Sequence, residues 1–91
     1  MQMIVREQAK KYAFDWRDEP LLRVREGETI AIETWDASTG FFKTPKDKAI
    51  PANRRGFDRS PPMANPIAGP VYIEGAERGD VLVACIEELE V

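Results

Sequence analysis

Residues 21–34 read LLRVREGETIAIET, and this stretch decides the fold class. Leu22 and Val24 alternate with charged residues, a Glu-Gly-Glu turn follows, and the alternation resumes at Ile30. Alternating apolar and polar side chains on both sides of a glycine-containing turn are typical of a β-hairpin. The stretch therefore predicts two antiparallel strands joined at Gly27.

Residues 70–91, PVYIEGAERGDVLVACIEELEV, repeat this arrangement. Val71 and Ile73 alternate with polar residues, a turn follows, and a second alternating run begins at Val81. In both units the turn places a glycine before an acidic residue, as expected where glycine takes a positive φ and the carboxylate accepts backbone hydrogen bonds. We interpret them as ordinary turns and expect a second hairpin.

Further strand patterns cover Met3–Val5 and, more weakly, Tyr12–Trp16. Between the two hairpin units, residues 35–69 hold five of the seven prolines and show no sustained periodicity. Residues 1–91 are therefore expected to form a single all-β domain of mainly antiparallel strands with one long irregular loop.

A connection as long as residues 35–69 usually has a function of its own or contacts a partner. We expect this loop to lie against a partner surface through four apolar anchors, namely Phe41, Phe42, Phe57 and Met63.

Composition narrows the classes of function. With 91 residues, 32% of them charged and 43% hydrophobic, the chain has the make-up of one small globular domain. Its 13 basic and 16 acidic residues are scattered, which argues against nucleic-acid binding because phosphate neutralisation needs a concentrated basic surface. No apolar run approaches a membrane span or a signal peptide, so we expect a cytoplasmic protein that does not bind membranes.

The chain contains no histidine and a single cysteine, Cys85. These counts exclude an internal disulfide, a Cys/His zinc cluster and a histidine-dependent catalytic triad formed by this chain. Because Cys85 lies in the apolar run VLVACI, we expect a small buried hydrophobic residue there rather than a reactive thiol.

Two polar stretches hold the candidate functional residues. In residues 33–40, ETWDASTG, Asp36 follows a predicted strand, where a carboxylate either reaches a loop-built site or caps a turn through neighbouring amides. In residues 65–76, NPIAGPVYIEGA, Glu74 is either a general base or metal ligand, or a surface carboxylate.

Three aromatic residues have a similar ambiguity. Each of them either lines a ligand pocket or packs in the core. The three residues are Trp16, Trp35 and Tyr72.

These stretches, in this order, resemble the acetamidase/formamidase family. Phe14-Asp15-Trp16 and residues 20–40 are similar to its early segment, in which a strand and a glycine-acid turn lead into an E-T-x-D-A-x-x-G string. Residues 65–82 are similar to its N-P-x-T-G-P-x-Y-V-E-G-A-x-P-G-D-x-L signature. The resemblance covers nearly the whole chain but corresponds only to the amino-terminal portion of a family member.

The resemblance implies a portion of a CUB-like β-sandwich and hydrolysis of the C–N bond of short linear amides, with release of ammonia. It implies Asp36 and Glu74 as catalytic residues, with Asp36 also a ligand of a divalent metal ion such as zinc or calcium. Substrate contacts would come from Trp35, Asn65 and Tyr72.

Because only the amino-terminal portion of the family pattern is present, we expect the chain to be inactive alone. A second polypeptide would supply the rest of the enzyme. The alternative is a non-catalytic β-sandwich module that associates with itself as a homo-oligomer.

Overall fold

The structure, a computed structural model, describes residues 1–48 and 63–91. Apart from one short 3-10 helix, every regular element in these residues is a strand, which confirms the prediction of a β-rich chain. The elements in chain order are β1 (Met3–Ile4), η1 (Arg6–Gln8), β2 (Leu22–Val24), β3 (Ala31–Ile32) and β4 (Val71–Ile73).

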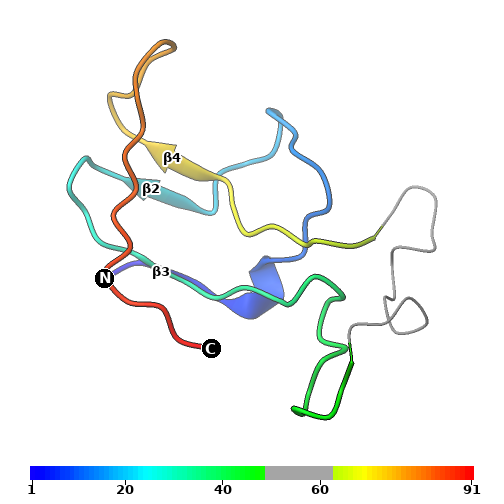
Figure 1. The fold of residues 1–91 in the computed structure, drawn as a ribbon. Coiled ribbons are helices and arrows are strands. Elements are labelled where there is room, and N and C mark those ends of the chain that lie inside the picture. The colour runs from blue at the N-terminus through cyan, green and yellow to red at the C-terminus, as the bar shows by residue number, and fades with distance from the viewer. Residues whose placement is uncertain (49–62) are drawn as a thin grey trace.

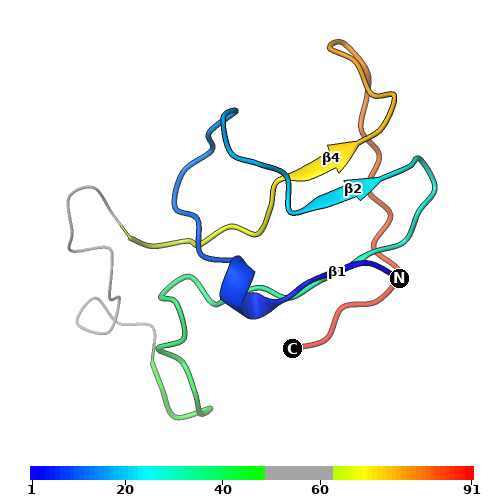
Figure 2. The same cartoon turned by 180° about the vertical axis from the view of Figure 1, so that it is seen from behind.

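The strands pair in parallel, so the prediction of mainly antiparallel strands is wrong for the regular pairs of the described residues. β1 lies beside β3 with Ile4 opposite Ile32, and β2 lies beside β4 with Val24 opposite Ile73 (Figures 1 and 2). The one antiparallel contact in the described part of the chain is the isolated bridge between Lys11 and Ile67.

The predicted hairpin at Gly27 fails although its turn forms. Glu28 N–H donates to Arg25 O at 3.1 Å, Arg25 N–H donates to a Glu28 carboxylate oxygen at 2.9 Å, and Gly27 has a φ of 82°. The segments on either side then separate, because β2 pairs with β4 and β3 pairs with β1. Residue alternation specifies which side chains share a face but not which strand lies alongside.

The second predicted hairpin is also wrong beyond its turn. The turn closes as expected, since Glu77 N–H donates to an Asp80 carboxylate oxygen at 2.9 Å and Gly79 has a φ of 98°. Residues 81–91, however, form no strand, and they run back past the ends of β4 and β2 toward the N-terminus (Figures 1 and 2). Cys85 in this segment is exposed, so the expectation of a buried thiol is wrong as well.

The core of the described residues is small. The buried apolar side chains are those of Ile4, Ala9, Val24 and Ala64, and Ile4 is the one large side chain among them that is fully buried. β1 and β2 thus each direct one apolar side chain inward, as expected for short strands with one covered face. The two strand pairs form separate two-stranded sheets in the described part of the chain.

Backbone hydrogen bonds tie one end of the loop at residues 35–69 to the segment before β2, and tie the two ends of the loop to each other. Lys11 and Ile67 exchange backbone hydrogen bonds of 3.3 and 2.7 Å. The strand expected at Tyr12–Trp16 does not form, because this isolated bridge is not extended past Lys11. Asn65 N–H donates to Ala37 O at 2.8 Å. These contacts bring residues 63–70 alongside the segment that precedes β2, where a pocket forms.

Two expected apolar anchors of this loop pack on one another. The rings of Phe41 and Phe42 meet edge to face with centroids 5.1 Å apart. Phe57 lies outside the described residues, and Met63 is 43% exposed. No helix in the described residues is long and apolar enough to cross a bilayer.

The Arg25–Glu28 turn supplies a pH-dependent contribution to stability. The Arg25 amide, and then the Gln2 side chain at 3.1 Å, donate to the Glu28 carboxylate and hold its pKa below 4.5. A folded-state pKa below the unfolded value stabilises the fold above the unfolded value, and this stability is lost as pH falls through the folded value.

We therefore expect the Glu28→Gln variant to unfold at a lower urea concentration than the unmodified chain at pH 6. The gap should narrow as pH falls below 4.5. Urea titrations at several pH values measure it, with the exposed neighbour Glu26→Gln as the matched control. A gap that stays constant with pH would contradict this role of the carboxylate.

Candidate functional site

The Asp36 carboxylate caps a tight turn shortly after β3. One of its carboxylate oxygens accepts the Ser38 amide at 2.7 Å, and the other accepts the Gly40 amide at 2.9 Å. Asp36 O also accepts the Thr39 amide at 3.0 Å. Of the two alternatives for this carboxylate, the turn cap is therefore the one that the structure forms.

Trp35 packs against cations instead of forming an open wall. The Arg6 guanidinium lies 4.6 Å and the Lys10 ammonium 4.9 Å from the ring centroid, both within the range of cation–π attraction. Trp35 Nε1–H donates to Arg6 O at 2.8 Å. The indole is thus fixed by contacts within the chain, at the side of the Asp36 turn.

Asn65 belongs to the same cluster through its backbone. It adopts a left-handed φ of 56° and donates its amide to Ala37 O. The structure therefore brings together three of the five predicted site residues, namely Trp35, Asp36 and Asn65.

Tyr72 and Glu74 lie elsewhere, on and just after β4. The Arg23 guanidinium lies 4.5 Å from the Tyr72 ring centroid, and Arg25 Nε lies 3.5 Å from a Glu74 carboxylate oxygen. The end of β4 and the segment after β3 occupy different parts of the fold in both views (Figures 1 and 2). Asp36 and Glu74 are therefore not brought together in one site.

The described residues do not fit a metal centre. No group of three or more His, Cys, Asp or Glu side chains among residues 1–48 and 63–91 is arranged to hold a metal ion. Asp36, the predicted ligand, accepts one backbone amide at each carboxylate oxygen and has no second candidate ligand beside it among these residues. A zinc or calcium ion would need ligands beyond these residues.

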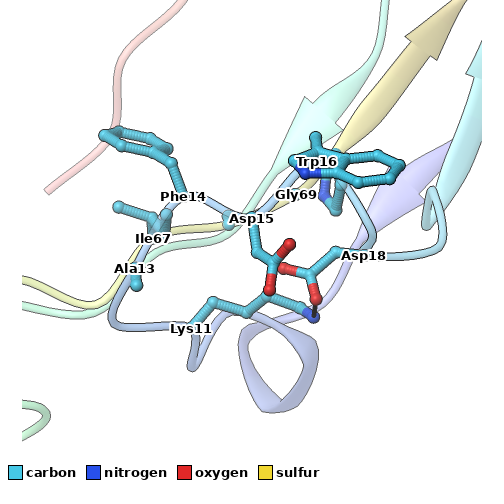
Figure 3. A pocket seen from close by; sticks show the side chains of 10 residues that line it. Lys11, Ala13, Phe14, Asp15, Trp16, Asp18, Ile67 and Gly69 are labelled. Carbon is cyan, nitrogen blue, oxygen red and sulfur yellow. Dashed lines mark ion pairs between the residues drawn. The ribbon is translucent and has the colours of Figure 1, made fainter.

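An open cavity of about 390 Å³ forms where the segment before β2 meets the segment before β4. It joins two stretches that are far apart in the chain, residues 11–18 and residues 67–70 (Figure 3). These stretches include the Phe14-Asp15-Trp16 string and part of the NPIAGP string. The cavity lining consists of Lys11, Ala13, Phe14, Asp15, Trp16, Asp18, Ile67, Ala68, Gly69 and Pro70.

Local turns hold the pocket open. Asp18 N–H donates to Asp15 O at 3.1 Å, which closes a turn and leaves the flanking aromatic side chains pointing outward. Phe14 is 93% and Trp16 92% exposed, and their rings stand apart at the rim in Figure 3. On the opposite wall, Gly69 has a φ of 142°, a backbone conformation that favours glycine.

Charged groups also line the pocket. Lys11 Nζ and an Asp18 carboxylate oxygen are 3.1 Å apart, and their side chains are 35% and 25% exposed. Arg17 holds Asp15 through two side-chain hydrogen bonds of 3.0 Å, and its backbone amide adds a third. The Arg17 side chain, and then its amide, lower the pKa of Asp15, so this carboxylate is a fixed negative charge at neutral pH.

Of the predicted site residues and pocket aromatics, only Trp16 lines this pocket. Lys11, Asp15 and Asp18, which also line it, were not among the predicted site residues. Asp15 and Trp16 stand in a family-like string, which was a usable signal. Lys11 and Asp18 lie in no regular element, so no helical or strand spacing could have shown that they meet.

Comparison of the chain with family models, with curated proteins and with solved structures yields no match.

Proposed function

We propose that this chain is one part of an amide hydrolase that cleaves the C–N bond of linear amides and releases ammonia. The observation that carries the proposal is the pocket itself. It forms where the Phe14-Asp15-Trp16 string and the NPIAGP string meet, and these are two of the stretches that resemble the acetamidase/formamidase family.

The lining of the pocket suits a small amide. Apolar side chains such as Ile67 and Pro70 form most of its surface, with a few charged groups converging between them. Such a combination is usual for small-molecule sites. Lys11 and Asp18 offer a hydrogen-bond donor beside an acceptor, which matches the C=O and N–H groups of an amide.

The proposal includes a second polypeptide that completes the enzyme, in a cytoplasmic assembly. A large exposed apolar surface is typical of a protein interaction site. The segment after β4 exposes its large apolar side chains, which are those of Val81, Leu82, Val83, Ile86, Leu89 and Val91. A partner that pairs with this segment and with the open edges of the β2–β4 pair would cover both.

Amide hydrolysis at neutral pH needs an activated water, a group that polarises the carbonyl and an acid for the departing amine. Glu74 remains the proposed general base of the assembly and Asp36 the second proposed catalytic residue. Neither residue lines the pocket in the described part of the chain. The Glu74 carboxylate lies beside Arg25, and the Asp36 carboxylate caps its own turn. In this proposal the partner polypeptide brings the missing groups to the amide.

Affinity purification of the chain under native conditions tests this proposal. The chain is expected to recover a second polypeptide, and the assembly is expected to release ammonia from a primary amide while the isolated chain does not. Glu74→Gln should lower the rate of ammonia release by about a hundredfold, the usual contribution of a general base. Glu26→Gln, on an exposed turn, is the matched control.

Asp36→Asn tests the second proposed catalytic residue, and it keeps one side-chain oxygen that can accept a backbone amide of the turn. A rate within a few-fold of the unmodified assembly would remove that residue from the catalytic role. An assembly that releases no ammonia from any primary amide would contradict the proposed function.

The exposed segment at residues 81–91 also favours a second candidate, a non-catalytic module that associates with itself. This candidate predicts a symmetric homo-oligomer and no ammonia release. The same purification separates the two, since sedimentation of the purified material distinguishes a homo-oligomer from an assembly with a different chain.

A further inference from the structure

We infer that the pocket takes a primary carboxamide that carries an aromatic or similarly bulky apolar group, with Lys11 and Asp18 binding the amide. This inference rests on the proposed function, because it names the substrate class of the same site. It differs from the formamide and acetamide that the family resemblance implies.

The polar part of the inference comes from the Lys11–Asp18 pair. A primary amide presents a carbonyl acceptor and an NH₂ donor side by side, and the pair presents an ammonium donor 3.1 Å from a carboxylate acceptor. Lys11 and Asp18 can bind one another and a ligand together, because an ammonium has three donors and a carboxylate has about four acceptor sites. Both side chains are partly exposed and line the cavity.

The size of the pocket points to a larger ligand. Its volume of about 390 Å³ lies in the range of sites that hold drug-sized molecules. Acetamide has four heavy atoms and occupies about the space of three water molecules, roughly 100 Å³. A formamide or acetamide molecule would therefore leave most of the cavity filled with water.

The apolar walls indicate what occupies the remaining space. Phe14 and Trp16 stand almost fully exposed at the rim, and Ala13, Ile67 and Pro70 line the walls. In the view of Figure 3 the two rings stand apart on one side of the chain, and Lys11, Asp15 and Asp18 lie below them. An aromatic ring attached to the amide carbon would gain apolar burial and contacts with these rings.

A comparison of ligands tests the inference without altering the protein. Calorimetric titration of the full 91-residue chain is expected to give benzamide at least about tenfold tighter binding than acetamide, because the ring is buried. Acetophenone keeps the ring and carbonyl but lacks the NH₂ group, so it should bind about tenfold more weakly than benzamide. Equal binding of benzamide and acetophenone, or of benzamide and acetamide, would overturn the inference.

Substitutions of Lys11 and Asp18 test whether these residues contact the bound amide. Lys11→Met and Asp18→Asn should each weaken benzamide binding about tenfold or more, because the first removes the donor and the second removes the charge of the acceptor. Lys10→Met and Glu19→Gln are the matched controls, since neither residue lines the pocket. Circular dichroism checks that each variant is folded. If a variant does not fold, the comparison of ligands on the unaltered chain is the test that applies. Unchanged binding in the two folded pocket variants would contradict the assignment.

The two proposals fail in different ways. Ammonia release by the assembly together with equal binding of benzamide and acetophenone would leave the proposed function standing and overturn this inference. Discrimination among the ligands without ammonia release from any amide would contradict the proposed function but support the pocket as a carboxamide-binding site.

Discussion

The Ile4→Ala variant is expected to lower the free energy of unfolding by about 2 to 5 kcal/mol, the usual cost of removing a buried isoleucine side chain. Ile4 is the one fully buried large side chain among the described residues, and it is the last residue of β1, where it pairs with Ile32 of β3. Because the core contains few other apolar side chains, little neighbouring structure is available to fill the cavity. Urea titration monitored by tryptophan fluorescence measures the change.

Ile32→Ala is the matched control. Ile32 is the register partner of Ile4 in the same parallel pair but is 45% exposed, so the same substitution removes less buried surface. It should cost about 1 kcal/mol or less. Equal losses for Ile4→Ala and Ile32→Ala would show that the inward face of β1 does not form the core.

The second large effect is expected for Gly40→Ala at the end of the Asp36 turn. Gly40 has a φ of 87°, and a Cβ atom built there would lie 2.7 Å from Cζ3 of Trp35. The left-handed backbone costs about 1 to 2 kcal/mol for a non-glycine residue. Displacing the indole, which is held by its hydrogen bond to Arg6 O, adds a packing cost, for a total of about 2 to 4 kcal/mol.

Gly27→Ala separates the two contributions. Gly27 has a similar φ of 82°, but no atom lies within 4 Å of the Cβ position. This variant should therefore lose only the backbone contribution of about 1 to 2 kcal/mol. If urea titration gives both variants the same loss, the close approach of Gly40 to Trp35 does not contribute to stability.

Local features of the chain were predictable because nearby residues determine them. Both glycine-acid turns form, and each acidic side chain accepts the expected backbone amide, at Glu28 from Arg25 and at Asp80 from Glu77. Asp36 caps its turn in the same way. The β-rich character follows from alternation within short segments, which is likewise a local property.

Strand partners were not predictable because they depend on segments far apart in the chain. The alternation around Gly27 is equally compatible with a hairpin and with two strands that each pair elsewhere. β2 pairs with β4 in parallel across a connection that includes the whole of residues 35–69. The exposed segment at residues 81–91 has a strand pattern but no strand partner in the described residues.

The site was predictable only in part, for the same reason. The stretches that resemble the acetamidase/formamidase family include residues 14–16 and 65–76, and the pocket forms between portions of these two stretches. The Lys11–Asp18 pair and the fork of Arg17 on Asp15 depend on a turn in an irregular segment. Asp36 and Glu74 were singled out from their positions at strand ends, where they have partners of their own.

The position of a bound amide is tested most directly by the indole N–H signals of the two tryptophans in a nuclear magnetic resonance spectrum. Trp16 lines the pocket, whereas the Trp35 indole is bound to Arg6 O and packed against two cations. Benzamide is expected to shift the Trp16 signal in a saturable manner and to leave the Trp35 signal in place. A Trp16 signal that does not move at saturating benzamide, or a shift confined to Trp35, would contradict the assignment of this pocket as the amide site.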